Sequence, residues 1–290
     1  MAVDINRSTV AMPSSVSNEI WQKTQEDSAV MSLARRIDLP GLGLTIPIIT
    51  GDPEAAWIKE TEKSPVKRGT FATKLITGYT LSVTVPFSNQ FRRDETALCN
   101  ALIDRLPRAL SKKFDATVFG AVTAPGENFD TLKNCAVQEI GTDSYKGLVA
   151  ADADVANHDG ILNGWVLSPQ GKAILLNALD ANKRPIFINN VSESAVPMIL
   201  GSRTLLSKGA YIKDATAAKK NVVGFAGDWT QAVYGVVEGV KATYADQATL
   251  DDGETPINLF QQDMFAVKAS IEVGFRCDTT VFNKLIQTTA

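Results

Sequence analysis

The residue best suited to catalysis in this chain is its single histidine, His158, the only imidazole available to a Ser–His or Cys–His nucleophile pair. It lies in ADADVANHDGIL, a polar segment that predicts a surface loop. Three aspartates of this segment could be calcium ligands: Asp152, Asp154 and Asp159. The twelve-residue calcium loop needs glycine at its sixth position and glutamate at its twelfth. Counted from Asp152, these positions hold Asn157 and Asn163, so we predict neither a catalytic histidine nor a calcium site.

The cysteines and the glycines give no stronger signal for chemistry. Cys99, Cys135 and Cys277 are far apart and odd in number, which argues against a disulfide framework and a zinc site and favours a reducing compartment during folding. Neither a phosphate-binding loop nor a dinucleotide fingerprint is present, so we predict no cofactor and no metal. A hydrolase that uses only carboxylates remains an alternative, because 32 Asp and Glu residues offer many pairs.

The composition is typical of a soluble globular protein. Its 290 residues are enough for two domains, or for one large domain with extensions. The apolar fraction is 44%, no uninterrupted apolar run of transmembrane length occurs, and the N-terminus does not have the pattern of a secretory signal. A net charge of −3 predicts that the chain as a whole does not bind nucleic acid tightly.

Residues 54–85, EAAWIKETEKSPVKRGTFATKLITGYTLSVTV, predict a long β-hairpin with a charged tip. Ala56–Glu60 and Thr70–Tyr79 read as its strands, and residues 61–69 as the tip. Beyond Gly78 the alternation continues through Leu81, Val83 and Val85, which would place one apolar face on the body. Exposed strand pairs are usually short because free edges invite aggregation. This pattern fits a solvated hairpin and an arm that contacts another subunit equally well.

The clearest helix is predicted over about residues 94–119, with Asp94 as its N-cap. Large apolar residues recur every four positions and form one stripe: Leu98, Leu102, Leu106, Leu110 and Phe114. The helix would run roughly 37 Å, with a bend at Pro107. So long an element is expected to be the backbone around which other segments pack.

The remaining elements are shorter and predict an α+β fold with a discontinuous domain. Helices are expected at 17–39, 131–139 and 171–180. Strands are expected at 42–49, 164–170, 184–190, 221–229 and 264–275. In the last of these strands Val267, Ala269, Ile271, Val273 and Phe275 share one face. We predict that it pairs with a strand near 42–49 or 80–85 and returns the C-terminus to the first domain.

The order of these parts resembles that of the major capsid proteins of tailed bacteriophages, whose shell fold was defined on a Hong Kong phage. SNEIWQKTQEDSAVMSLARRIDLPGLGLTIPI is similar to the family's N-terminal arm, and the A-x-W-x-x-E start and G-T-F return strand of residues 54–71 to its extended loop. RDETALCNALIDRLPRALSKKFDATVFG looks like the spine helix, and GWVLSPQGKAILLNALDANKRPIF like the axial domain. NLFQQDMFAVKASIEVGFRCDTTVF resembles the last strands of the peripheral domain. Each motif is loose, and their collinear order over most of the chain carries the resemblance.

The resemblance implies a division of the chain. Residues 1–35 would be the N-terminal arm, 51–85 the extended loop, and 140–252 the axial domain. The peripheral domain would combine residues 36–50, 86–139 and 253–290, with the spine helix at about 94–119. The extended loop would reach across a neighbouring subunit, where these side chains would make contacts: Trp57, Glu60, Glu62, Lys63, Lys67, Arg68 and Phe71. Affinity would come mainly from Trp57 and Phe71, because exposed ion pairs contribute only about 0–1 kcal/mol each.

Some members of the family link their subunits by an isopeptide bond between a loop lysine and an asparagine, assisted by a buried glutamate. Lys63 lies near the place of that lysine, but the positions that match the other two hold Asp263 and Ser270. We therefore predict a shell without covalent cross-links.

The resemblance also implies partners. The chain would assemble with itself into hexamers and pentamers of an icosahedral shell around double-stranded DNA, without sequence-specific binding and without a membrane. Only about 20 residues precede Ile20, too few for the family's scaffolding segment, so a separate scaffolding protein is expected, with a portal protein and a possible decoration or cement protein. The protein would be a virion component made in the host bacterial cytoplasm, and not an enzyme. An encapsulin-type nanocompartment shell, which shares the fold, is the alternative.

Overall fold

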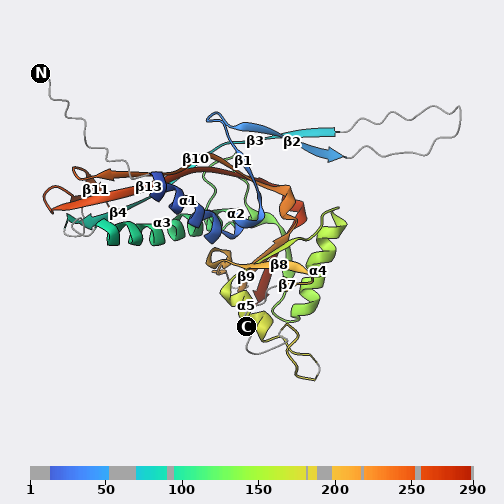
Figure 1. Ribbon diagram of the computed structural model, residues 1–290. Helices are drawn as coiled ribbons and strands as arrows, with labels where there is room; N and C mark the ends of the chain where they lie inside the picture. The colour runs from blue at the N-terminus through green and yellow to red at the C-terminus, as the bar shows by residue number, and fades with distance from the viewer. Residues whose placement is uncertain are drawn as a thin grey trace, which may run out of the picture.

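The computed structural model describes residues 14–51, 70–89, 95–180, 182–187, 198–216, 219–251 and 256–288. They form a four-stranded sheet, a six-stranded sheet, helices that pack on each, and a two-stranded hairpin that projects from the body (Figure 1). The mixture of helices and sheets agrees with the predicted α+β class.

The four-stranded sheet has the order β1-β10-β13-β4. Its strands are β1 (Arg35–Asp38), β10 (Ala232–Ala245), β13 (Met264–Cys277) and β4 (Tyr79–Ser88). β13 is antiparallel to both of its neighbours, and its pairing with β4 confirms one of the two predicted partners. The five alternating apolar residues predicted on one face of this strand are all buried.

Three helices pack with this sheet: α1 (Ser14–Asp27), α2 (Ala29–Leu33) and α3 (Glu95–Val118). α3 is the predicted spine helix, with Pro107 inside it. Leu106, Leu110 and Phe114 are buried and share one hydrophobic core with β13. The Phe114 ring meets Phe275 edge to face, with centroids 6.5 Å apart. The apolar stripe therefore joins the helix to the sheet, as the spacing predicted.

The N-terminal helix predicted over 17–39 is wrong in its second half. The chain starts a new helix at Ser28, whose side chain accepts a hydrogen bond from the Met31 backbone amide. Arg35–Asp38 then pairs in parallel with β10, and this strand pairing prevails over the local helical pattern. The helices of residues 14–33 also pack against α3.

The six-stranded sheet has the order β5-β14-β9-β6-β8-β7. Its strands are β5 (Ala136–Glu139), β14 (Phe282–Thr288), β9 (Lys220–Gly227), β6 (Gly164–Leu167), β8 (Ser202–Leu206) and β7 (Met198–Ile199). Helices α4 (Ser144–Asn157) and α5 (Pro169–Leu176) share a second core with this sheet. Phe225 of β9 stacks on Phe119, just beyond α3, at a centroid distance of 4.7 Å.

Several short elements differ from their predictions. The segment around Asp152 and His158 was predicted to be a loop, but helix α4 runs through it to Asn157, because Leu148, Ala151 and Val155 bury one face. Residues 131–139 contain a short 3₁₀ helix, η2 (Leu132–Asn134), and strand β5 instead of an α-helix. Of the strand predicted at 184–190, residues 184–187 form only an isolated bridge, and the rest lies outside the described residues.

Two of the connections between the two sheets run through similar turns. η4 (Trp229–Gln231) links β9 to β10, and η5 (Thr279–Val281) links β13 to β14. Asp228 and Asp278 each accept hydrogen bonds from the amide and the hydroxyl of the threonine two residues later. The two turns are also bonded to each other, because the Asp228 amide donates to the Val281 carbonyl and the Asp278 amide donates to the Gln231 carbonyl.

These crossings change the predicted domain boundaries. β10, predicted within the 140–252 segment, belongs to the four-stranded sheet, and β14, predicted within 253–290, belongs to the six-stranded sheet. Strand β2 (Leu44–Gly51) lies in the projecting hairpin instead of in the 36–50 segment of the body, while β4 within 51–85 belongs to the four-stranded sheet. Local sequence patterns identify strands but not their partners, so they could not predict which of the two sheets β10 and β14 join.

Short segments complete the described structure. β11 (Thr249–Asp251) and β12 (Pro256–Asn258) pair beside the start of β13, and η3 (Lys208–Ala210) packs against α3. No described helix is long and apolar enough to cross a membrane.

Candidate functional site

The projecting hairpin is the candidate intersubunit arm. β2 and β3 (Thr70–Ile76) are antiparallel, from Leu44 opposite Ile76 to Gly51 opposite Thr70. Figure 1 shows this pair extending away from both sheets. Six of the predicted contact residues lie outside the described residues: Trp57, Glu60, Glu62, Lys63, Lys67 and Arg68. The backbone of Phe71 lies in β3 opposite Ile49, and its side chain lies outside the described part, so these contacts stay predictions.

The arm joins the body where its backbone passes very close to β13. A Cβ atom on Gly274 would collide with the Thr77 carbonyl, and one on Gly78 would come within 2.5 Å of the Val237 side chain and 2.9 Å of Glu272. Glycine at both positions therefore allows the end of β3 to lie directly on the sheet.

A charged network holds the arm at this junction, and we call Lys74, Asp130 and Arg276 the anchor. Nη1 of Arg276 lies 2.8 Å from Oδ1 of Asp130, and Nζ of Lys74 lies 3.3 Å from Oδ2 of the same carboxylate. The side chains are 12% exposed for Arg276, 20% for Asp130 and 37% for Lys74. The Arg276–Asp130 pair is thus largely removed from water, and its charged hydrogen bonds are stronger there than at an open surface, whereas Lys74 stays partly exposed.

The anchor also binds the backbone on both sides of the junction. Arg276 donates from Nε to the Leu75 carbonyl of the arm at 2.8 Å and from Nη2 to the Asn128 side chain at 2.8 Å. Lys74 donates to the Cys277 carbonyl at 3.0 Å, and the Cys277 amide donates to Asp130 at 3.3 Å. Strand β3, the end of β13 and the loop around Asp130 are consequently fixed to one another.

A second polar cluster joins the N-terminal helices, the spine helix and the loop before η3. The buried Asp115 carboxylate of α3 accepts hydrogen bonds from the Ser28 hydroxyl at 2.6 Å, the Ala29 amide at 3.1 Å and the Ser207 hydroxyl at 2.9 Å. Burial raises the pKa of Asp115 to about 6, and the hydrogen bonds from Ser28 and Ser207 oppose this rise.

The raised pKa of Asp115 predicts a pH-dependent stability. Because the folded protein holds this proton more tightly than the unfolded chain, the stability that Asp115 contributes is full below about pH 4 and is lost as the pH rises through about 6. The free energy of unfolding that Asp115 contributes should fall by roughly 3 kcal/mol between these pH values. Urea unfolding of the subunit between about pH 4 and 6.5 should show this slope for the wild type and lose it for Asp115→Asn.

Asp214 supplies the matched control. It lies at the surface and is only partly buried, and the hydrogen bonds from Thr216 lower its pKa, so Asp214→Asn should leave the slope in this pH range unchanged. An Asp115→Asn protein whose stability still falls by the same amount between these pH values would contradict the assignment.

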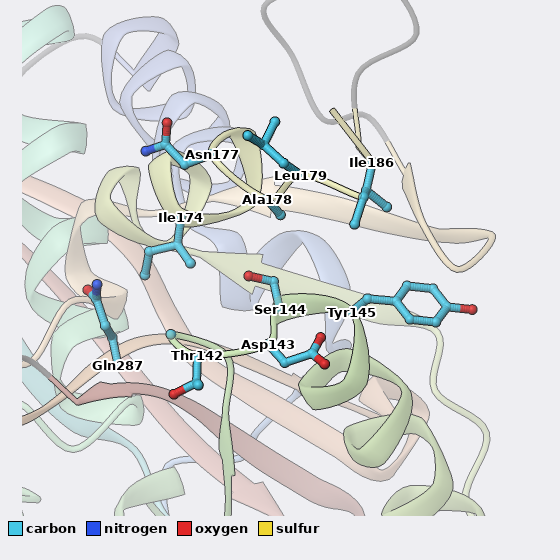
Figure 2. A pocket seen from close by; sticks show the side chains of 11 residues that line it. Thr142, Asp143, Ser144, Tyr145, Ile174, Asn177, Ala178, Leu179, Ile186 and Gln287 are labelled. Atoms are coloured by element: carbon cyan, nitrogen blue, oxygen red, sulfur yellow. The ribbon is translucent and has the colours of Figure 1, made fainter. Parts of the chain in front are cut away.

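A pocket of about 460 Å³ lies on the six-stranded side of the molecule. Figure 2 shows Ile174, Leu179 and Ile186 on one side of it and Asp143, Ser144 and Tyr145 on the other. Asp143 is the one carboxylate among its described lining residues, and it already accepts a hydrogen bond from the Lys146 amide as the N-cap of α4. The pocket therefore does not supply the pair of carboxylates that a carboxylate-dependent hydrolase needs.

Other chemically active side chains are also in structural roles. Cys135 and Cys277 are buried free thiols, and burial raises the pKa of Cys135 to about 12 and that of Cys277 well above its ordinary value, so both are poor nucleophiles. His158 is exposed, with Nδ1 2.8 Å from the Asp154 carbonyl. The described residues hold no group of three or more His, Cys, Asp and Glu placed to bind a metal ion.

The positions considered for an isopeptide bond are partly described. Oδ1 of Asp263 accepts a hydrogen bond from Nδ2 of Asn89 at 2.6 Å, in a turn where Asp263 has a φ of 52°. The Ser270 hydroxyl lies 3.4 Å from the Lys241 carbonyl on the sheet. Lys63 lies outside the described residues, so the absence of a cross-link stays a prediction.

Comparison with known proteins places this arrangement in a family. Residues 9–278 match the model of the "Phage capsid family". A probable major capsid protein of Mycobacterium phage L5 is 28% identical over 285 residues, which cover 92% of this chain and 86% of the relative. The major capsid protein of Staphylococcus phage 80alpha is 21% identical over 281 residues, covering 92% and 82% of the two chains.

Solved structures share the same fold. A chain from Mycobacterium phage Adephagia has a TM-score of 0.71 at 18% identity and covers 91% of each chain. A chain from Mycobacterium phage Ogopogo has a TM-score of 0.73 at 15% identity, covering 90% of this chain and 92% of the other. The structure described as the capsid of an empty GTA particle has a TM-score of 0.62 at 14% identity, covering 91% and 97%. The molecule therefore has the fold of a phage shell protein, and the chain belongs to the phage capsid family.

Proposed function

We propose that this chain is a major capsid protein that assembles with copies of itself into hexamers and pentamers of an icosahedral shell around double-stranded DNA. The family match over residues 9–278 carries this conclusion. The projecting hairpin with a firmly held base supports it, because an arm fixed at one end can present its far end to a neighbouring copy.

Within this function, the four-stranded sheet with α1, α2 and α3 corresponds to the peripheral domain, and the six-stranded sheet with α4 and α5 to the axial domain. The arm carries the proposed intersubunit contacts, from Trp57 to Phe71. The anchor sets the direction in which the arm leaves the body, since it ties Leu75 to β13.

We further propose that the shell is held without covalent cross-links and that the chain is a component of the virion, not an enzyme. An aspartate at position 263 and a serine at 270 do not supply the carboxamide and the carboxylate base that cross-linking needs. A separate scaffolding protein, a portal protein and a decoration or cement protein are the proposed partners, and synthesis takes place in the host bacterial cytoplasm. The net charge of −3 supports a shell whose subunits do not bind the enclosed DNA tightly.

Sedimentation of the chain expressed together with a scaffolding protein tests this proposal. The expected result is shell-sized particles that dissociate, after boiling in denaturant, into a single band of monomer. A protein that stays a monomer or small oligomer under these conditions would contradict self-assembly. A ladder of multimers would contradict only the absence of cross-links. Nuclease-resistant double-stranded DNA in particles from infected cells separates a capsid from an encapsulin-type shell, which would hold a protein cargo.

A further inference from the structure

Strand β4 forms a long edge of the four-stranded sheet. Its ten residues pair with β13 in an unbroken register, from Tyr79 opposite Val273 to Ser88 opposite Met264. In an antiparallel ladder about half of a strand's N–H and C=O groups point to its other side. Among the described residues, no backbone hydrogen bond reaches that other side between Tyr79 and Phe87.

The other edges of the described sheets have features that prevent further pairing. At the opposite edge of the same sheet β1 is short, and β10 beyond it is bulged at Glu238 and carries an exposed Glu238–Lys241 pair at 3.8 Å. The six-stranded sheet ends in β5, of four residues, and β7, of two. In the arm, β2 contains Pro47. Short strands, bulges, charges and proline are the usual means of blocking an edge.

Strand β4 has almost none of these features. Its sequence YTLSVTVPFS contains no charge, and its single proline, Pro86, lies near one end. A long, uncharged edge of this kind pairs readily with another strand. Since this edge differs from β1, from both edges of the six-stranded sheet and from β2, its composition points to an interface.

The core beneath β4 is also incompletely covered. Leu81, Val83 and Val85 pack against the core but stay partly exposed, whereas Val267 and Ile271 on the adjacent β13 are each 1% exposed. The apolar face of the sheet thus continues to the free edge. One more strand would complete the hydrogen-bond ladder and cover this apolar row at the same time.

We propose that the outer edge of β4 receives a β-strand from a second copy of this chain. This inference rests on the proposed function, which brings many copies into contact. A strand satisfies the free backbone groups, and a neutral edge offers no charge by which nucleic acid or an acidic or basic partner would be held. The shell would then contain sheets that continue from one subunit into the next.

Hydrogen exchange, measured residue by residue in assembled particles and in unassembled subunits, tests the pairing. Every second amide between Tyr79 and Val85 should exchange at least 100-fold more slowly in particles, since the intervening amides are already bonded to β13. Equal rates in the two states, or equal slowing of all these amides, would overturn strand addition while leaving shell assembly established. Slow exchange of the β4 amides that appears only when a different protein is added would show that the partner strand does not come from a second copy of this chain. Failure to form particles would overturn the proposed function as well.

A pair of lysine variants gives an independent test. Val83→Lys places a charge under the free edge, where the long side chain can reach solvent in the isolated subunit but not beneath an added strand. Its yield of particles should fall at least tenfold. Thr84→Lys adds the same charge at the neighbouring, exposed position and should assemble like the wild type. Circular dichroism verifies that both subunits fold, and normal assembly of Val83→Lys would overturn the proposal.

Discussion

Replacing Gly274 by alanine should lower the free energy of unfolding by roughly 2–3 kcal/mol and prevent assembly of closed shells. The added methyl group would collide with the carbonyl oxygen of Thr77, where the arm passes over the sheet. Gly274 lies within β13, between its neighbouring strands, so the arm has to move. Urea unfolding measures the first effect, and sedimentation of the expressed protein measures the second.

Gly239→Ala is the matched control for this substitution. Nothing lies within 4 Å of a Cβ at Gly239, so the variant should unfold at nearly the same urea concentration as the wild type and assemble normally. If Gly274→Ala forms shells with wild-type yield, the close approach of arm and sheet is not needed for assembly, and the account of the junction is wrong.

Arg276→Met should destabilise the subunit by roughly 2–3 kcal/mol and reduce the yield of shells strongly. The substitution keeps the apolar stem but removes the hydrogen bonds to Leu75, Asn128 and Asp130. The Asp130 carboxylate, only 20% exposed, would keep Lys74 as its remaining ion-pair partner. The arm would then lose its main polar attachment to the body.

Lys241→Met tests whether the loss of any ion pair on this sheet has the same result. Lys241 and Glu238 are both 60% exposed, and such a pair contributes about 0–1 kcal/mol. This variant should therefore assemble normally. Equal losses of stability in Arg276→Met and Lys241→Met would contradict the role given to the anchor.

The elements with a strong period were predictable from the sequence. The four-residue spacing of Leu106, Leu110 and Phe114 predicted α3, and the alternation from Val267 to Phe275 predicted β13 and its buried face. Both patterns arise because one face of each element is buried in a continuous core. The order of these elements also identified the family, which the comparison with known proteins confirms.

Features that depend on distant partners could not be predicted in this way. The turns at Asp228 and Asp278 lead the chain from one sheet into the other, to β10 and to β14. Nothing in the sequence of either strand indicates which strand it pairs with. The polar composition around Asp152 concealed a helix whose buried face consists of small and medium residues such as Ala151 and Val155.

The candidate site was predictable only in outline. The alternating pattern predicted strand β3 of the arm, but not its partner: β3 pairs with β2, whereas the predicted partner Ala56–Glu60 lies outside the described residues. The anchor that holds the arm was not predicted. Lys74, Asp130 and Arg276 come from three distant parts of the chain, and each alone looks like an ordinary surface charge. A charged residue at the end of a buried alternating strand, as Arg276 is, was the only local signal of a buried partner.

Cryo-electron microscopy of particles formed by this chain would show whether the arm joins neighbouring subunits. We expect an icosahedral shell of pentamers and hexamers in which the arm, held at its base by Arg276 and Asp130, lies across a neighbouring copy. A small discrete oligomer whose arm folds back on its own subunit would contradict it.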